Sequence, residues 1–302
     1  MDVARILSKT PEELAETDMA DYALEALRES KVKNVYLLGR RGPAQAAFTP
    51  PEIKEMGELV DSDVTVPADE AAVDAVSLEY MENNPDKNVE KNIGYVTDYA
   101  GRDRTDKSKL LTIRFLVSPT ELIGEDGRII GVKIVKNEAY KSDDGSVRPR
   151  ATEVTEELPM GLVFRSVGYR GVSLPDVPFH ESWGTIENEK GRVQTSDGET
   201  VTGLYTAGWI KRGPSGVIGT NKTCAQETVQ CMVKDLEAGK LLEPDSTDRD
   251  ALEALVRERQ PQVITYEDWK AIDAAEISKG ESDGRPRVKF TNLEDMLALL
   301  GR

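Results

Sequence analysis

The sequence predicts an α/β protein with more than one domain, and two observations lead to this prediction. Residues 2–8 and 10–30 read as helices, and the β-branched and aromatic run VKNVYLLG at residues 32–39 is typical of a buried strand. Helices that precede a buried strand follow the alternation of an open α/β sheet. The second observation is the length, since 302 residues suffice for two domains of ordinary size.

The first two predicted helices differ in the capping signals at their N-terminal ends. Residues 2–8, DVARILS, are expected to form an amphipathic helix with Val3, Ile6 and Leu7 facing inward. No capping residue precedes this helix in the sequence. The next helix begins at the segment TPEE, residues 10–13, where a threonine caps the first turn and a proline fits its first position.

The middle of the chain changes to extended structure. The runs at residues 111–123 and 128–139 are joined by Glu125-Asp126-Gly127, which predicts a hairpin. The polar residues 140–157 are expected to form a surface loop or a hairpin tip. The apolar segment GLVF within residues 158–171 predicts another buried strand that leads into a glycine-rich loop, and we place a domain boundary near Gly168.

The last part of the chain predicts a strand at residues 204–206, a glycine-bearing loop and a helix from about Thr220. Cys224 and Cys231 fall two turns apart on one face of that helix, roughly 10 Å by the helical rise. This distance is too long for a disulfide, and the spacing fits neither a Cys-x-x-Cys pair nor a zinc site. We therefore expect both to be small buried side chains. His180 is the only histidine, which excludes a histidine-based triad or a multi-histidine metal site.

The composition restricts the class of partner. The chain has 39 Lys plus Arg and 55 Asp plus Glu, a formal net charge of -16, which argues against general nucleic-acid binding. It contains no apolar run long enough to span a membrane and no signal peptide at its start, so a cytoplasmic protein outside the membrane is expected. Against this acidic background, a local basic cluster is informative.

Arg40 and Arg41 form such a cluster directly after the strand predicted at residues 32–39. In a Rossmann-type unit, this position meets the adenosine ribose, where an acidic residue binds a 2′-hydroxyl and arginines bind a 2′-phosphate. The planar guanidinium pairs with phosphate oxygens through two charge-assisted hydrogen bonds. Gly39 and Gly42 flank the pair and are expected to let the backbone turn tightly. The pair therefore predicts NADP(H) as the coenzyme, and the alternative is an exposed basic turn.

Four motifs in this order resemble the ferredoxin–NADP⁺ reductases of the adrenodoxin-reductase type. They are GRRGPAQAAFTPPEIKE, VFRSVGYRG, AGWIKRGPSGVIGTNK and GRPRVK, and the similarity extends from Met1 to the C-terminus. The resemblance implies FAD and NADP(H) as cofactors and ferredoxin as the electron acceptor. We further expect a monomer in the cytoplasm, with no membrane or nucleic-acid partner.

On the nucleotide side, the resemblance implies a role for five residues. Arg40 and Arg41 match the pair that binds the 2′-phosphate of NADP. Glu52 matches a carboxylate near the bound nicotinamide nucleotide, and Glu55 matches a further acidic residue of that region. Asp2 matches an acidic position that the family associates with a proton or electron path, so Asp2 and Glu55 are the candidate catalytic residues.

On the flavin side, Trp209 matches a tryptophan at the flavin, and Gly216, Val217 and Ile218 match backbone that contacts FAD. The residues themselves support this interpretation, because a glycine-rich loop that opens a helix directs backbone N–H groups toward an anion or a polar ring edge. A tryptophan that is merely a buried anchor is the alternative. Lys211 and Arg212 are candidates for docking an acidic ferredoxin, or else form a solvated loop.

The sequence departs from the family because no Gly-x-Gly-x-x-Gly fingerprint occurs between a strand and a helix near its start. We therefore expect residues 1–168 to form a Rossmann-like NADP-binding domain without its first strand. Residues 169–302 are expected to form the C-terminal part of an FAD-binding domain, in a chain that lacks the N-terminal FAD-binding region. A sheet without a central strand exposes apolar faces, so such a chain is expected to be poorly stable and to hold FAD weakly or not at all.

The function implied is that of an FAD-dependent NADPH:ferredoxin oxidoreductase, in which hydride passes between NADPH and FAD and single electrons pass to ferredoxin. Two alternatives stay open at this point. One is a non-catalytic, truncated NADP-binding module. The other is a flavin reductase subunit that serves a different acceptor, as in the small subunits of glutamate synthase, against which Trp209 and the GRPRVK motif argue.

Overall fold

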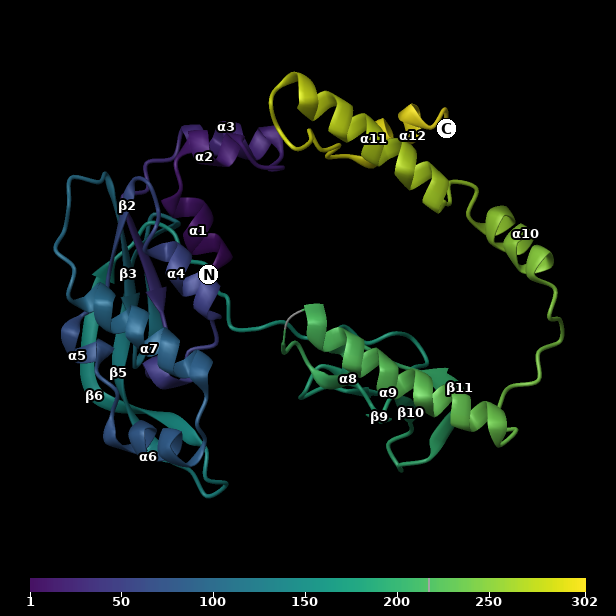
Figure 1. The fold of residues 1–302 in the computed structure, drawn as a ribbon, viewed down its shortest axis with the longest axis horizontal. Helices are drawn as coiled ribbons and strands as arrows, with labels where there is room; N and C mark the ends of the chain where they lie inside the picture. Colours follow the sequence, from purple (N-terminus) through teal and green to yellow (C-terminus); the bar gives the residue numbers. More distant parts are fainter. Residues whose placement is uncertain (217) are drawn as a thin grey trace. The chain divides into compact units, whose positions relative to one another are not determined.

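The computed structural model describes residues 1–216 and 218–302, which form two compact units (Figure 1). The first unit comprises Met1–Val163 together with Gln260–Arg302, and the second comprises Phe164–Arg259.

The division between the units falls close to the boundary predicted near Gly168, although the last 43 residues, Gln260–Arg302, group with the first unit. The assignment of residues 1–168 to NADP binding and of 169–302 to FAD binding stays a prediction.

A three-stranded parallel sheet forms the centre of the first unit, with strand order β1-β3-β2. Its strands are β1 (Asn34–Leu38), β2 (Ser62–Thr65) and β3 (Lys109–Arg114). The strand predicted at residues 32–39 is confirmed as β1. Leu38 at the end of β1 lies opposite Arg114 at the end of β3, so both strands end at the same carboxyl edge.

Helices cover one face of this sheet (Figure 1). They are α1 (Asp2–Ser8), α4 (Pro50–Met56), α5 (Ala68–Ala71) and α7 (Lys87–Ala100), with α2 (Pro11–Ala15), α3 (Asp21–Arg28), the 3-10 turn η1 (Pro43–Gln45) and α6 (Ala75–Asn83) around them. The capping box predicted at Thr10 and Glu13 is confirmed. In α1, Leu7 packs against the core as predicted, but Val3 is exposed, because Ala4 and Ser8 take the buried face instead.

A three-stranded antiparallel sheet covers the other face, with order β4-β5-β6. It consists of β4 (Val117–Glu125), β5 (Arg128–Lys141) and β6 (Val147–Pro159). The hairpin predicted at Asp126-Gly127 is confirmed, with positive φ angles of 47° and 74° at these residues. The loop predicted over residues 140–157 is shorter than expected, because β6 already begins at Val147 and pairs with β5.

Strand β1 lies between these two layers. Val35 faces the core formed with the helices, whereas Tyr36 and Leu38 pack against the antiparallel sheet at Val117 and Ile134. Alternate residues of a strand point to opposite faces, so a run buried on both sides is apolar at successive positions. This explains why VYLL within β1 has no polar residue.

The buried strand predicted for GLVF at residues 161–164 is wrong. The structure shows no strand between Pro159 and Phe179, and the side chains of Leu162 and Phe164 are 58% and 55% exposed. An apolar run becomes a strand only where a neighbouring strand offers its free N–H and C=O groups, and the described chain places none beside these residues.

The C-terminal part of the first unit contains α11 (Tyr266–Ser282) and α12 (Leu293–Leu299). The GRPRVK motif between them returns to the N-terminal helices. Arg285 donates to the side chain of Asp21 and to the carbonyl of Met19, and Lys289 pairs with Asp18 at 2.8 Å. This motif therefore ties the end of the chain to the first residue of α3 and to the segment before it.

The second unit is built on short antiparallel strands and one long helix. A sheet of order β11-β10-β9 lies beside the hairpin β7-β8. The elements are β7 (Phe179–His180), β8 (Thr185–Ile186), β9 (Asn188–Glu189), β10 (Arg192–Gln194), β11 (Thr200–Tyr205), α8 (Trp209–Arg212), α9 (Ile218–Glu237) and α10 (Arg249–Arg259). Cys224 and Cys231 are buried and free, as predicted.

Tyr99 on α7 makes the stability of the first unit decrease at alkaline pH. Its side chain is 1% exposed, and its hydroxyl donates to the carbonyl of Ile53 at 2.7 Å. Burial raises the pKa of Tyr99 from 10.0 to about 12. The pKa of Tyr99 is therefore higher in the folded than in the unfolded chain. The stabilisation that this difference gives to the folded state is complete below pH 10 and is lost as the pH rises toward 12.

We expect Tyr99→Phe to lower the free energy of unfolding at pH 8 by about 1 kcal/mol through the lost hydrogen bond. The variant should then lose less stability than the wild type between pH 10 and 12. Urea midpoints at pH 8, 10 and 11 measure both effects, and parallel declines in the two proteins would contradict the assignment.

Candidate functional site

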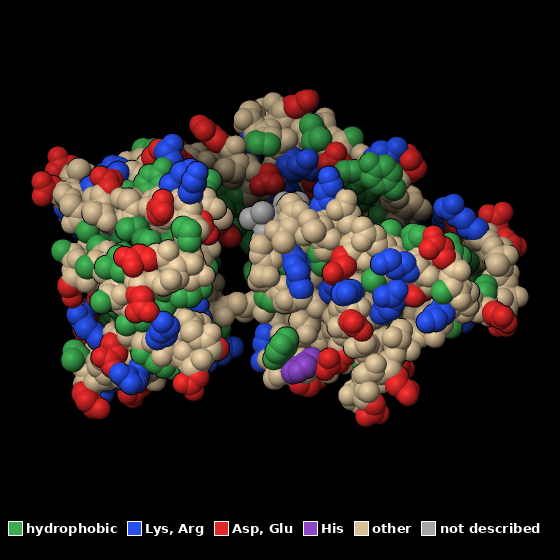
Figure 2. Space-filling model, turned by 60° about the horizontal axis from the view of Figure 1, so that its bottom comes forward, with side chains coloured by type: hydrophobic (Ala, Val, Ile, Leu, Met, Phe, Trp, Pro, Cys, Tyr) green, Lys and Arg blue, Asp and Glu red, His purple; other side chains and the backbone are tan. Residues whose placement is uncertain are grey.

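The carboxyl edge of the parallel sheet carries the predicted arginine pair. Arg40 and Arg41 follow β1 after Gly39, and both side chains are exposed. Within residues 1–216 and 218–302, neither guanidinium has an ion pair or a side-chain hydrogen bond, unlike Arg114 beside them. Figure 2 shows basic and acidic side chains interspersed over the face drawn. Two unpaired arginines in a chain of net charge -16 are available for an anion.

The backbone that carries this pair is fixed by hydrogen bonds to the crossover between β3 and β4. The N–H of Gly39 donates to the carbonyl of Arg114 at 2.8 Å, and the N–H of Leu116 donates to the carbonyl of Arg41 at 3.1 Å. The chain bends at Arg40 and Arg41, between the flanking glycines, although neither glycine has a positive φ and Gly42 lies at -75°. A Cβ added at Gly39 would lie 3.4 Å from the carbonyl oxygen of Arg114, which is an ordinary van der Waals contact.

Glu52 lies at the start of α4, where it completes a capping box with Thr49. Its Oε2 accepts from the backbone N–H of Thr49 at 2.6 Å and from the hydroxyl of Thr49 at 2.8 Å. This hydrogen bonding fixes the first turn of α4 and orients the carboxylate. A role for Glu52 beside a nucleotide stays a prediction.

The structure brings Asp2 and Glu55 together through one shared arginine. Arg5 donates from its Nε to Glu55 Oε2 at 2.8 Å and from a terminal nitrogen to Asp2 Oδ1 at 2.5 Å. Lys9 lies 3.3 Å from the other oxygen of Glu55. The two candidate catalytic carboxylates thus belong to one cluster on α1 and α4, with a cation for each negative charge.

Trp209 lies in the second unit at the first position of α8. Its indole stacks on the ring of Tyr169, with centroids 5.8 Å apart and an interplanar angle of 25°. The two rings line a pocket of about 190 Å³ together with Arg170, Gly171, Ile210 and Pro214. Trp209 is 45% exposed, so it is not a buried anchor. A flat aromatic pair on the wall of a pocket suits a planar ring system.

The glycines around α8 adopt backbone angles that other residues avoid. Gly208, Gly213 and Gly216 have φ of 77°, 86° and 78°, and an added Cβ at Gly216 would lie 2.5 Å from the hydroxyl oxygen of Thr220. Of the other predicted flavin contacts, Val217 lies outside the described residues, and Ile218 is the first residue of α9.

Lys211 and Arg212 are engaged within the second unit. Lys211 pairs with Glu227 at 2.7 Å and also donates to the hydroxyl of Thr228, and Arg212 donates to the side chain of Asn221 at 2.9 Å. These contacts fasten α8 to α9. The solvated loop that we considered is wrong for Lys211, whose side chain is largely buried.

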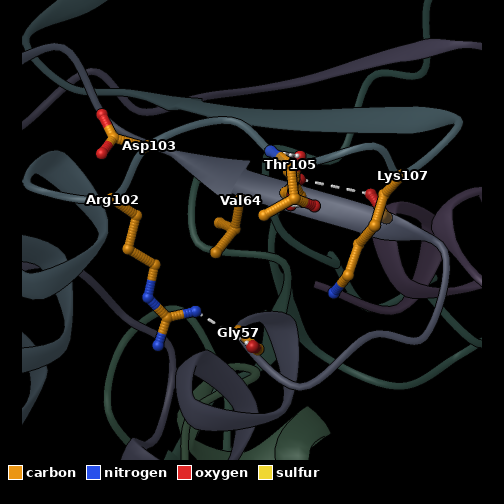
Figure 3. Close-up of a pocket in the computed structure, with 8 residues that line it drawn as sticks. Gly57, Val64, Arg102, Asp103, Thr105 and Lys107 are labelled. Carbon is orange, nitrogen blue, oxygen red and sulfur yellow. Dashed lines mark hydrogen bonds between the residues drawn. The ribbon is translucent and has the colours of Figure 1, made fainter.

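A larger pocket, of about 250 Å³, lies at the opposite end of the parallel strands (Figure 3). It is lined by Gly57, Ser62, Asp63, Val64, Arg102, Asp103, Thr105 and Lys107. Arg102 donates to the carbonyl of Gly57 at 3.0 Å, and Asp63 accepts from the backbone and the hydroxyl of Thr105. Ligands of open α/β sheets bind beyond the carboxyl ends of the strands, so this pocket at the amino end of β2 is not our candidate site.

Sequence reasoning missed two residues at these sites. Tyr169 lies in the segment GYRG, where nothing local indicates that it stacks on Trp209. Asn137 on β5 contacts the backbone of Arg40, and nothing local marks it, because it is one of three consecutive polar residues in the segment IVKNEA.

Comparisons with known proteins agree with the motifs. No protein-family model matches the chain. The NADPH-ferredoxin reductase FprA of Mycobacterium leprae (strain TN) is 42% identical over 300 residues, which cover 99% of this chain and 64% of the relative. The mitochondrial NADPH:adrenodoxin oxidoreductase of Mus musculus is 37% identical over 319 residues, which cover 100% of this chain and 61% of the relative.

A solved structure is also similar over nearly the whole chain. FprA of Mycobacterium tuberculosis in complex with NADPH superposes with a TM-score of 0.89 at 40% sequence identity, covering 99% of this chain and 64% of that one. The chain therefore spans a little under two thirds of the length of the proteins to which it is similar.

Proposed function

The chain belongs to the ferredoxin–NADP⁺ reductases of the adrenodoxin-reductase type, and we propose that it acts in the transfer of electrons from NADPH to a ferredoxin. It has the predicted fold class, a Rossmann-like NADP-binding domain together with the C-terminal part of an FAD-binding domain of the two-dinucleotide-binding flavoprotein type. In the proposed reaction, FAD accepts hydride from NADPH and passes single electrons to ferredoxin.

One observation supports the proposal above the others, namely the unpaired arginines at the carboxyl edge of the parallel sheet. Arg40 and Arg41 would hold the 2′-phosphate of NADP(H), because this edge is where an adenosine ribose meets the second strand of a dinucleotide-binding sheet. Their fixed backbone would present both guanidinium groups to a dianion without first ordering a loop.

In the second unit, the segment around α8 fits a flavin. The stacked pair of Trp209 and Tyr169 would offer one aromatic face to the planar ring system, and Gly213 and Gly216 place no side chain beside it. The backbone N–H groups of Gly216 and of Ile218, the first residue of α9, would contact the flavin, and Val217 lies outside the described residues. Among these residues, Trp209 would exclude water from the ring face.

Asp2 and Glu55 are our proposed catalytic residues, and their contact with Arg5 supports treating them as one unit. Arg5 forms an ion pair with each of the two carboxylates, so the three side chains are held as one charged cluster. This cluster would lie beside the nucleotide and orient it. Glu52 would orient the bound nucleotide from the start of α4.

The proposed partner is a ferredoxin, as the names of the relatives indicate for those proteins. Nucleic acid and membrane are not proposed as partners; among the described residues, no helix is long and apolar enough to cross a membrane. We include a cytoplasmic location and a monomeric state in the proposal. Gel filtration of the purified chain tests the monomeric state.

The test is a coupled electron-transfer assay with purified protein, added FAD, a ferredoxin and cytochrome c as the final acceptor. We expect NADPH to support cytochrome c reduction only when ferredoxin is present, and NADH to support it far more slowly. A visible spectrum recorded after unbound FAD has been removed by desalting shows whether flavin is bound, because a band near 450 nm then stays with the protein. Binding of NADPH without reduction of bound flavin would instead support a non-catalytic NADP-binding module.

A further inference from the structure

Residues 39–41 follow β1 at the carboxyl edge of the sheet, and backbone hydrogen bonds hold them there. Besides the two backbone hydrogen bonds described above, the N–H of Val117 donates to the carbonyl of Gly39 at 3.1 Å. Almost any residue can form backbone hydrogen bonds of this kind, so they do not explain which side chains are required to hold residues 39–41.

One side chain holds this segment, and it comes from the antiparallel sheet. Asn137 on β5 donates from its Nδ2 to the carbonyl of Arg40 at 2.9 Å and to the hydroxyl oxygen of Ser118 at 2.8 Å. In the part of the chain that the structure describes, no other side chain bonds to the backbone of residues 39–41. Both hydrogens of the Asn137 amide are therefore used, which no residue with a single donor can imitate.

Asn137 is itself fixed. It is 9% exposed, and its backbone N–H donates to the carbonyl of Leu116 at 2.7 Å. Leu116 has a positive φ of 53° where the chain crosses from β3 to β4, and it also bonds to Arg41. The amide of Asn137 thus fixes the carbonyl that precedes Arg41 relative to both sheets.

We propose that Asn137 is a positioning residue that sets the preference for a 2′-phosphorylated nucleotide, an inference that rests on the proposed role of Arg40 and Arg41. The carbonyl of Arg40 belongs to the peptide that joins the two arginines. Holding this peptide fixes the directions in which both side chains leave the backbone. Each long arginine side chain loses rotamer freedom when it binds a phosphate. A backbone that already fixes the Cα positions of both arginines adds no further loss, so both guanidinium groups can bind one phosphate well.

The test uses the full 302-residue chain and two ligands, adenosine 2′,5′-bisphosphate and adenosine 5′-monophosphate, which differ by the 2′-phosphate alone. We expect Asn137→Ala to raise the Kd for the bisphosphate about tenfold in isothermal titration calorimetry, while the Kd for the monophosphate changes less than twofold. Asn137→Leu, which keeps the side-chain volume, should give the same selective loss if the smaller residue disturbs folding.

Thr152→Val is the matched control, because Thr152 donates to the carbonyl of Lys136 at 2.9 Å in the same sheet but does not contact residues 39–41. We expect it to leave both Kd values unchanged. Equal losses for the two ligands in the Asn137 variants, or no loss for either, would overturn the inference.

The double variant Arg40→Ala/Arg41→Ala, titrated in the same way, separates this inference from the proposed function. If it loses the preference for the bisphosphate and the Asn137 variants keep it, the proposed function stands and the role of Asn137 is wrong. If the double variant keeps the preference, the proposed function itself fails.

Discussion

Replacing both arginines, Arg40→Ala with Arg41→Ala, should lower kcat/KM for NADPH about 100-fold in the ferredoxin-coupled assay, equivalent to about 2.8 kcal/mol. The corresponding value for NADH should change less than threefold. The reason is that each exposed guanidinium has no protein partner among the described residues, so its hydrogen bonds to a phosphate replace only water. We expect the loss in KM rather than in kcat, because the phosphate lies away from the reacting ring.

A charge-matched control distinguishes local contact from a change in net charge. Arg148→Ala with Arg150→Ala also removes two positive charges, but from β6, where these arginines pair with Asp144 and Glu138. We expect this control to leave the ratio of the two kcat/KM values at that of the wild type. Equal effects of the two double variants on NADPH would show that the arginines act through overall charge, contrary to the proposed role.

Arg114→Met should lower the free energy of unfolding of the first unit by about 3–5 kcal/mol. The guanidinium at the end of β3 is buried and forms a forked hydrogen-bonded pair with the carboxylate of Glu70 on α5, at distances of 2.7 to 2.9 Å. A further bond of 2.8 Å joins it to Glu156 on β6. The hydrogen bonds that Arg114 donates to Glu70, and then those to Glu156, raise the pKa of Arg114 above its ordinary value.

The large effect follows from what the substitution leaves behind. Glu70 is also buried and accepts the backbone N–H of Phe115 at 2.9 Å, so methionine would leave a carboxylate charge in the core with a single partner. Lys136→Met is the matched control, since its pair with Asp69 is exposed and should be worth about 0–1 kcal/mol. Chemical denaturation of both variants measures the difference, and similar losses would contradict a buried role for Arg114.

The elements that surround the site were predictable where a few neighbouring residues decide the structure. The run that becomes β1 is apolar and aromatic from Val35 to Leu38, and Asp126-Gly127 has the composition that positive φ angles favour. The Thr10 capping box is likewise complete within four residues. For the same reason the position of Arg40 and Arg41 at the end of a strand could be read from the sequence.

The rest depends on residues that are far apart in the chain. The contact between Asn137 and Arg40 spans 97 residues, and the pair of Arg5 with Glu55 spans 50. Neither leaves a periodic pattern that sequence reasoning can detect. The opposite error occurred at GLVF, where a strand-like composition has no neighbouring strand to pair with among the described residues.

The most direct test of the central claim is an NMR titration of the ¹⁵N-labelled chain that follows the Nε–H signals of Arg40 and Arg41. With adenosine 2′,5′-bisphosphate we predict saturable shifts of both signals, and with adenosine 5′-monophosphate much smaller ones at the same concentration. Signals assigned by single substitution would identify each arginine. Unchanged Arg40 and Arg41 signals at saturating bisphosphate, or equal shifts with both ligands, would contradict the claim that this pair holds the 2′-phosphate.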